Sequence, residues 1–377
     1  MIYLDHNATT PVLPAVVEAM MPYLHEQWGN PSSTYHFGAK LKRPLEVARE
    51  QIAEFLGAHP MDIIFTSGGT ESNNAALHAI ARTHPEKRHI VTCAAEHSAV
   101  LSYCRDLESQ GYQITYLPVN REGLVSLADL ENAITPGTAG VSLMWANNET
   151  GVLFPIEEIS SHCQSRGILF HCDAVQAAGK VPIDLKAVPI DYLAITGHKF
   201  GAPKGIGALY VRPKAPFSPF ARGGHQERGR RGGTENVPLI VGFGTAAALG
   251  CCGLFDYDRS VRPLRDTLET GLISTIPEAT LNGHPAQRLG NTTNLHFPGI
   301  DSQALLLLLD QVDLCASSGS ACLADSPDPS HVIAAMKPGS AAQESLRFSL
   351  GVTNTMEEII ETIEVVRRLS SSLASVR

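Results

Sequence analysis

Short apolar runs alternate with longer amphipathic stretches over much of the chain. The runs that we predict as strands are residues 62–66, 89–92, 141–145, 167–170 and 191–195. The stretches that we predict as helices between them are residues 72–82, 98–109 and 156–166. Strands that alternate with helices indicate βαβ units. The sequence therefore predicts an α/β fold with a mainly parallel sheet that helices cover on both faces.

The pattern changes after about residue 250. The elements predicted beyond it are a long amphipathic helix over 259–276, a strand over 291–297, a helix over 302–309 and a closing helix over 357–374. No internal repeat or low-complexity linker interrupts the chain. We predict two domains, which are a large one of residues 15–258 and a small one formed by residues 1–14 and 259–377.

The composition narrows the class of protein. The chain of 377 residues carries 29 basic and 38 acidic residues, and its formal net charge of -9 argues against a general nucleic-acid binder. Hydrophobic residues make up 44% and are spread throughout, which excludes disorder of the whole chain. The eight cysteines include no C-x-x-C pair, so we expect reduced thiols rather than a disulfide framework. The first residues lack the features of a secretory signal, and the longest apolar run, 304–309, cannot span a bilayer. We expect a soluble, cytoplasmic protein with no membrane or direct nucleic-acid partner.

A glycine-rich turn is the first candidate site. Residues 66–74 read Thr-Ser-Gly-Gly-Thr-Glu-Ser-Asn-Asn, between a predicted strand and a predicted helix. Glycines let backbone N–H groups approach an anion, and the start of the helix adds the positive end of its dipole. Thr70 offers a hydroxyl to a phosphate oxygen. The pattern is neither a Walker A loop nor a dinucleotide-binding motif. Alone, it fits a phosphate site and an ordinary N-capped helix equally well.

Two charged residues, Asp173 and Lys199, stand at the ends of predicted strands. A lysine at the mouth of a sheet, crowded by His198, is a candidate for bonding to an aldehyde, because desolvation lowers its pKa. Taken singly, each of the two is more often a surface or salt-bridged residue. Together with the turn at 66–74, they form the set typical of a pyridoxal-phosphate enzyme. The turn would take the phosphate, the aspartate the ring nitrogen and the lysine the aldehyde.

A cysteine lies in a segment rich in Ser, Gly, Pro and Asp, which predicts a mobile loop over about 316–331. The residue is Cys322. On an exposed, flexible loop a cysteine can act as a nucleophile, and the alternative is an unreactive surface thiol. The loop alone does not decide between them.

Motifs along nearly the whole chain carry a family resemblance. They occupy residues 3–11, 66–73, 95–97, 146–149, 173–179, 197–199, 226–236, 318–322 and 346–350. In this order and spacing they resemble the cysteine desulfurases of the NifS/IscS type, which are fold-type I pyridoxal-phosphate enzymes of the class V aminotransferase family. The resemblance implies a large domain with a mainly parallel seven-stranded sheet and a small α+β domain.

The resemblance also implies an activity and its partners. L-Cysteine would be converted to L-alanine, with its sulfur transferred to Cys322 as a persulfide and then to an acceptor or scaffold protein. The acceptor could serve iron–sulfur cluster assembly or the sulfuration of another cofactor, tRNA or DNA. The enzyme would be a homodimer. No resident metal is implied, although Cys322 would be able to ligate, transiently, an iron–sulfur cluster shared with a scaffold.

Carried over to this chain, the resemblance assigns roles to single residues. Lys199 would bind the cofactor aldehyde, Cys322 would be the nucleophile, and His97 would stack on the ring and move protons. Asp173 would bind the ring nitrogen and Gln176 the ring hydroxyl. The remaining cofactor contacts would be Gly69, Thr70, Thr196, Gly197 and His198, with Thr234 of a second subunit completing the phosphate site. The residues implied to bind the substrate carboxylate are Asn148 and Arg347.

Other functions stay open on the sequence. A selenocysteine lyase would use the same residues, and an aminotransferase of class V would need no mobile cysteine. A sulfur-relay protein that is not an enzyme would use only Cys322. The sequence does not name the sulfur acceptor.

Overall fold

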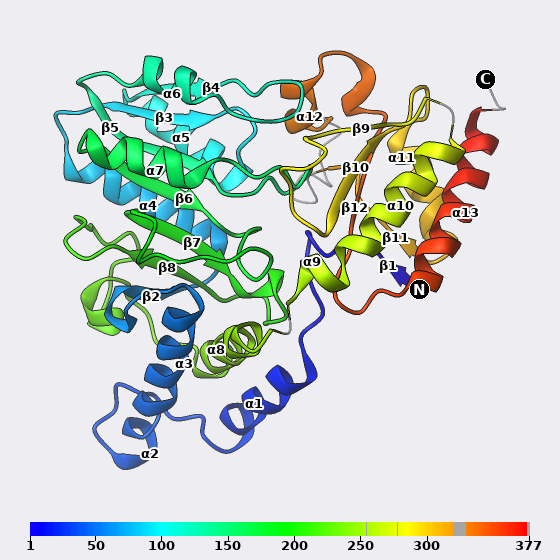
Figure 1. The fold of residues 1–377 in the computed structure, drawn as a ribbon. Coiled ribbons are helices and arrows are strands. Elements are labelled where there is room, and N and C mark those ends of the chain that lie inside the picture. Colours follow the sequence, from blue (N-terminus) through cyan, green and yellow to red (C-terminus); the bar gives the residue numbers. More distant parts are fainter. Residues whose placement is uncertain (254, 277, 320–328, 375–377) are drawn as a thin grey trace.

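A seven-stranded sheet forms the centre of the larger part of the molecule (Figure 1). The computed structural model describes residues 1–253, 255–276, 278–319 and 329–374. The strands, in their order across the sheet, are β2 (Ile63–Thr66), β8 (Gly207–Val211), β7 (Tyr192–Thr196), β6 (Leu169–Asp173), β5 (Thr138–Met144), β3 (His89–Cys93) and β4 (Gln113–Leu117). β8 runs antiparallel to both of its neighbours, β2 and β7, and the other neighbouring pairs in this sheet are parallel. The predicted α/β fold with a mainly parallel sheet is confirmed.

Helices cover both faces of this sheet. Most of its strands are therefore buried along their whole length. The helices of this part are α1 (Pro14–His25), α3 (Lys42–Phe55), α4 (Gly69–Thr83), α5 (Ser98–Ser109), α6 (Leu127–Ala133), α7 (Ile156–Ser165) and α8 (Val237–Cys251). Side chains alternate along a strand, so neighbours pack on opposite faces. Ile64 accordingly belongs to one apolar cluster and Phe65 to another.

A smaller group of elements packs beside the sheet (Figure 1). It contains the three-stranded sheet of β12 (Ser345–Ser349), β10 (Thr292–His296) and β9 (Thr280–Leu281), the pair β1 (Ile2–Tyr3) and β11 (Leu314–Cys315), and helices α10 (Arg262–Thr275), α11 (Ser302–Asp310) and α13 (Met356–Ala374). Leu4 shares an apolar cluster with Leu268 and Phe348 of this group. By contrast, Val332 of α12 (His331–Met336) packs with the cluster of the large sheet. The domain boundary near residue 258 stays a prediction.

Most predicted elements differ from the observed ones by one to three residues at an end, and two of the differences are informative. The helix predicted over 259–276 is broken into α9 (Tyr257–Ser260) and α10, with Val261 between them. Pro263 lies in the first turn of α10, where its missing N–H costs nothing, whereas inside one continuous helix it would remove a hydrogen bond. The strand predicted over 167–170 is observed as β6, which makes Asp173 its last residue.

No helix among the described residues has both the length and the apolar character needed to cross a lipid bilayer.

The part of the fold that matters for function is one edge of the large sheet. β5, β6 and β7 run parallel and end at Met144, Asp173 and Thr196. Their carboxyl ends therefore meet at the edge where open α/β sheets bind ligands.

Candidate active site

A cavity of about 170 Å³ opens at the carboxyl ends of β5, β6 and β7. It is lined by Asn7, Ala8, Gly69, Thr70, Asn73, His97, Met144, Ala146, Asn148, Asp173, Val175, Gln176, Thr196, His198, Lys199 and Arg347. Most of the predicted site residues are therefore brought together. Gly197 and Thr234 are described by the structure and do not line it, and Cys322 lies outside the described residues.

Lys199 reaches the cavity from a short turn. β7 ends at Thr196, and one 3₁₀ turn (Gly197–Lys199) follows it. The Nζ of Lys199 donates to the backbone oxygens of Asn7 and Ala8, at 2.6 and 2.8 Å. The N-terminal segment thus holds the amine at the mouth of the sheet.

Asp173 is a buried carboxylate that faces the cavity. Its Oδ2 accepts a hydrogen bond from Asn73 Nδ2 at 2.5 Å, and its Oδ1 accepts one from the backbone N–H of Val175 at 2.9 Å. Burial raises the pKa of Asp173, while the nearby His97 and Lys199 and the two hydrogen bonds act in the opposite direction. A cationic ring nitrogen in the cavity would stabilise the ionised form of this carboxyl group. Asn73 belongs to the glycine-rich motif, but the sequence did not indicate its role.

His97 begins α5 as its N-cap residue. Its Nδ1 accepts a hydrogen bond from the backbone N–H of Ala99 at 3.1 Å, so the neutral ring carries its proton on Nε2. The preceding residue, Glu96, is fully buried, and its Oε1 accepts from the backbone N–H of Met144 at 2.6 Å. Burial raises the pKa of Glu96 well above its usual range, and the charge of Asp173 raises it further. Nothing in the sequence singled out Glu96 as a buried acid.

The glycine-rich turn forms the N-terminus of α4 at the cavity wall. Gly68 has φ +155°, and a Cβ on Gly69 would lie 2.7 Å from Cγ2 of Val175, so the second glycine keeps the wall open. Thr196 donates its hydroxyl to the backbone oxygen of Ile206 at 3.0 Å. Its hydroxyl proton would have to turn toward the cavity to meet an anion.

The two predicted site residues outside the cavity have different surroundings. Gly197 is buried, and a Cβ there would lie 2.8 Å from Cβ of Ala202. Its place is therefore in the packing behind Lys199. Thr234 is exposed. Its assignment to the site of a second subunit stays a prediction.

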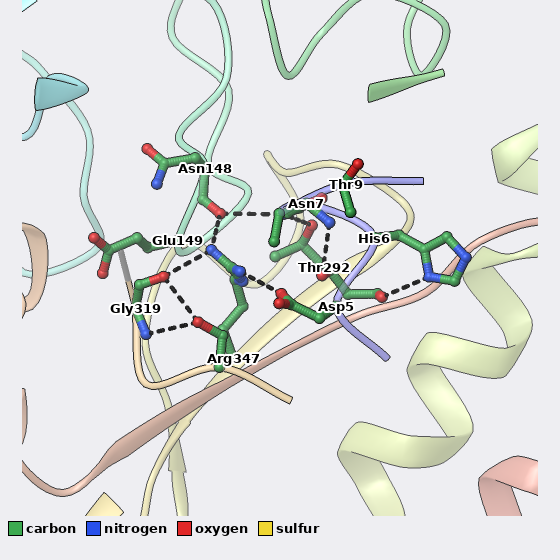
Figure 2. A network of polar contacts seen from close by, with 12 residues as sticks. Asp5, His6, Asn7, Thr9, Asn148, Glu149, Thr292, Gly319 and Arg347 are labelled. Carbon is green, nitrogen blue, oxygen red and sulfur yellow. Dashed lines mark hydrogen bonds and ion pairs between the residues drawn. The ribbon is translucent and has the colours of Figure 1, made fainter. Parts of the chain in front are cut away.

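Arg347 is buried on β12 and lines the cavity, and Figure 2 shows its polar contacts. Its Nη1 donates to the backbone oxygens of Asn148 and Gly319, at 3.0 and 2.9 Å. Its Nη2 donates to Oδ1 of Asp5 at 2.5 Å. Its Nε has no hydrogen-bond partner among the described residues. A buried guanidinium with a spare donor at a cavity can bind a carboxylate.

Asn7 makes hydrogen bonds to several segments around the site, and Figure 2 shows those to Asn148 and Thr292. Its Nδ2 donates to the backbone oxygen of Asn148 at 3.1 Å and to Oγ1 of Thr292 at 2.9 Å. Its own backbone oxygen accepts from Lys199 and from Nε2 of Gln176, the latter at 2.9 Å. The sequence placed Asn7 within a family motif but gave it no role.

The site has the groups that a phosphorylated aromatic aldehyde requires. The α4 N-terminus offers backbone donors to a phosphate, Asp173 faces a ring nitrogen, and Lys199 offers an amine to the aldehyde. No cluster of His, Cys, Asp and Glu side chains able to hold a metal ion occurs in the part of the chain that the structure describes. The residues present therefore fit pyridoxal phosphate.

Known proteins resemble this chain along nearly its whole length. The family model described as "Aminotransferase class-V" matches residues 2–361. A cysteine desulfurase of Trichormus azollae is 52% identical over 373 residues, covering 99% of this chain and 93% of the relative. The cysteine desulfurase NifS of Azotobacter vinelandii is 47% identical over 377 residues, covering 100% and 94%. A solved NifS-like protein matches with a TM-score of 0.92 and 36% identity, covering 98% of this chain and 99% of that one.

Proposed function

Because the chain belongs to the aminotransferase class-V family, we propose that it is a pyridoxal-phosphate-dependent cysteine desulfurase. It converts L-cysteine to L-alanine and receives the sulfur on Cys322. The observation that carries this proposal is the single cavity that gathers Asp173, Lys199, the α4 N-terminus and Arg347. The cysteine desulfurases to which the chain is about half identical along its length support it.

The cofactor supplies an electron sink next to the substrate α-carbon. The residues that would hold it are Asp173 at the ring nitrogen, Gln176 at the ring hydroxyl, and Gly69 and Thr70 at the phosphate. Lys199 would hold its aldehyde. The Nζ of Lys199 would also be the base that accepts the α-proton of the substrate and later returns it.

Substrate binding falls to Arg347. Arg347 lines the cavity, and its guanidinium would donate to the carboxylate of L-cysteine. His97 would donate from Nε2, because its Nδ1 is engaged with the backbone. His97 and Lys199 both line the cavity, so a proton donor and an amine would face the bound substrate.

Sulfur transfer then takes place at Cys322. Its thiolate attacks the sulfur of L-cysteine, so an S–S bond forms as the carbon–sulfur bond of the substrate breaks. The electron pair of the broken bond stays with the substrate carbon, which takes up a proton and becomes the methyl group of alanine. One cysteine and one thiol thus give one alanine and one persulfide.

A second copy of the chain would complete the enzyme. The exposed apolar side chains of Val17, Met21 and Leu24 on α1 offer a surface that such a copy would bury. Thr234 would then reach the phosphate site of the partner. The persulfide would pass to an acceptor protein, such as a scaffold for iron–sulfur clusters, and the reduced thiol that the reaction requires suits a cytoplasmic location.

The test uses purified protein loaded with pyridoxal phosphate and given L-cysteine. Wild type should form alanine and a protein persulfide in equal amounts. Cys322→Ser should lose both products in the absence of a reductant, while the exposed control Cys252→Ser should keep them. Persulfide and alanine made by Cys322→Ser at the wild-type rate would show that another residue is the nucleophile.

The same preparation separates the alternatives. Transfer of an amino group to a keto acid that survives Cys322→Ser would favour an aminotransferase. Faster turnover of selenocysteine than of cysteine would favour a selenocysteine lyase. A wild-type protein that takes up no pyridoxal phosphate would favour a sulfur relay.

A further inference from the structure

Lys180 is a buried lysine that the proposed reaction does not use. It is 7% exposed and lies four residues after Gln176 in the chain. Its Nζ donates to Oε1 of Gln176 at 2.7 Å and to Oδ1 of Asn7 at 3.2 Å. Both of these partners are amide oxygens, which bear no full charge. Burying a lysine against uncharged partners lowers the stability of the folded protein, so we expect these contacts to serve a function.

The surroundings make Lys180 reluctant to carry its charge. Burial lowers its pKa well below the usual range, and the charges of Lys199 and Arg347 lower it further. Charged or neutral, the amine offers at least two N–H donors. Each N–H meets one of the two amide oxygens.

This contact determines which way the amide of Gln176 faces. Because Oε1 is bound to Lys180, the NH₂ group lies on the other side, where it donates to the backbone oxygen of Asn7. Gln176 lines the cavity and Lys180 does not. The second N–H of Gln176 is therefore the one available to a ligand oxygen.

The same contact determines the amide of Asn7. Its Oδ1 accepts from Lys180 and also from Nδ2 of Asn291, at 3.1 Å. Its NH₂ group must then face Asn148 and Thr292, as Figure 2 shows. In this orientation the backbone oxygen of Asn7 receives Nζ of Lys199.

We propose that Lys180 is a positioning residue, which turns the N–H donors of Gln176 toward the cavity and holds Asn7 against Lys199. This inference rests on the proposed function. A reversed Gln176 amide would present an acceptor in place of a donor, so the hydrogen bond from its N–H to the ring oxygen of the cofactor would be lost.

The experiment is a titration of the cofactor-free, full-length protein with pyridoxal phosphate, followed by absorbance. Four proteins form the cycle: wild type, Lys180→Met, Gln176→Ala and the double variant. Lys180→Met should weaken cofactor binding about tenfold, as expected for the loss of one well-placed hydrogen bond. In the Gln176→Ala background, replacing Lys180 should weaken binding less than it does in the wild-type background, because the part of its effect that acts through that amide is already lost. Lys186→Met, an exposed lysine of the same segment, is the matched control.

Several outcomes would overturn the proposal. Wild-type cofactor affinity in Lys180→Met would do so, and so would equal losses from Lys180→Met in both backgrounds, which would indicate a merely structural role. If Lys180→Met does not fold, Lys180→Ala, which also lacks the N–H donors, enters the same cycle and is read in the same way. A wild-type protein that fails to bind pyridoxal phosphate would contradict the proposed function itself, before the variants are compared.

Discussion

Arg347 and Asp5 form an ion pair at the cavity, with 2.5 Å between Nη2 and Oδ1, although 342 positions separate them in the chain. The guanidinium is 2% exposed and the carboxylate 17%. Asp5 therefore occupies one donor of the arginine that we assign to the substrate carboxylate. The carboxylate of Asp5 keeps the guanidinium in position, and it also competes with the substrate carboxylate for the charge of Arg347.

The first prediction concerns this competition. Asp5→Asn keeps an oxygen for Nη2 but removes the negative charge. We expect the KM for L-cysteine to fall about fivefold, which corresponds to roughly 1 kcal/mol, with kcat within about a factor of two. Steady-state alanine formation measures both constants. A rise in KM would show instead that the charge of Asp5 mainly positions Arg347.

The second prediction tests the guanidinium itself. Arg347→Lys keeps the charge but loses the planar fork and its contacts with the backbone oxygens of Asn148 and Gly319. We expect the KM for L-cysteine to rise at least about tenfold. Cofactor affinity should stay near that of wild type. An unchanged KM would remove Arg347 from the substrate site.

The third prediction separates stability from function at Asp173. Asp173→Asn removes a carboxyl group whose pKa is raised by burial, so the cofactor-free protein should melt at the same or a higher temperature. The loaded enzyme should lose at least about a hundredfold in kcat, because the ring nitrogen loses its charged partner. Melting curves and alanine formation provide the two measurements. A large fall in melting temperature together with full activity would contradict the assignment.

The fourth prediction concerns pH. The pKa of Glu96 is well above its usual value in the folded protein, mainly because of burial. Between its ordinary pKa and the raised one, the folded protein holds a proton that the unfolded chain has released. The free energy of unfolding should therefore fall with rising pH, by about 1.4 kcal/mol per pH unit from this group.

Glu96→Gln keeps an acceptor for the N–H of Met144 and cannot titrate. Its unfolding free energy should fall less steeply over that range than that of wild type. Chemical denaturation of both cofactor-free proteins, from the ordinary glutamate pKa upward, makes the comparison. Parallel curves would mean that Glu96 is ionised in the folded protein.

The fifth prediction concerns the glycine-rich turn. In Gly69→Ala the new Cβ would lie 2.7 Å from Cγ2 of Val175, so the wall must shift. We expect the affinity for pyridoxal phosphate to fall about tenfold or more, since a shift of this wall disturbs the donors at the α4 N-terminus. The double variant Gly69→Ala/Val175→Ala removes the contact and should recover most of the affinity. No recovery would place the defect elsewhere than at Val175.

The local sequence pattern was sufficient to predict part of the site. Asp173 and Lys199 follow apolar runs, and the carboxyl ends of parallel strands meet at one edge of a sheet, so their proximity could be predicted. Local pattern failed where one helix was predicted over 259–276, because the apolar spacing continues across Val261 while Pro263 begins a new helix. Periodicity measures which faces are apolar, and it does not register where a helix begins.

The sequence by itself determined the α/β class, the glycine-rich turn and the strand-end charges, since each depends on residues close together in the chain. The tertiary structure alone decided that Asn7 lies against Lys199, that Asp5 pairs with Arg347 and that Glu96 and Lys180 are buried. The N-terminal segment reaches both β12 and the end of β7, and no periodicity within it encodes these distant contacts. Burial and charge pairing are properties of the packed molecule, because they depend on which surfaces the rest of the chain covers.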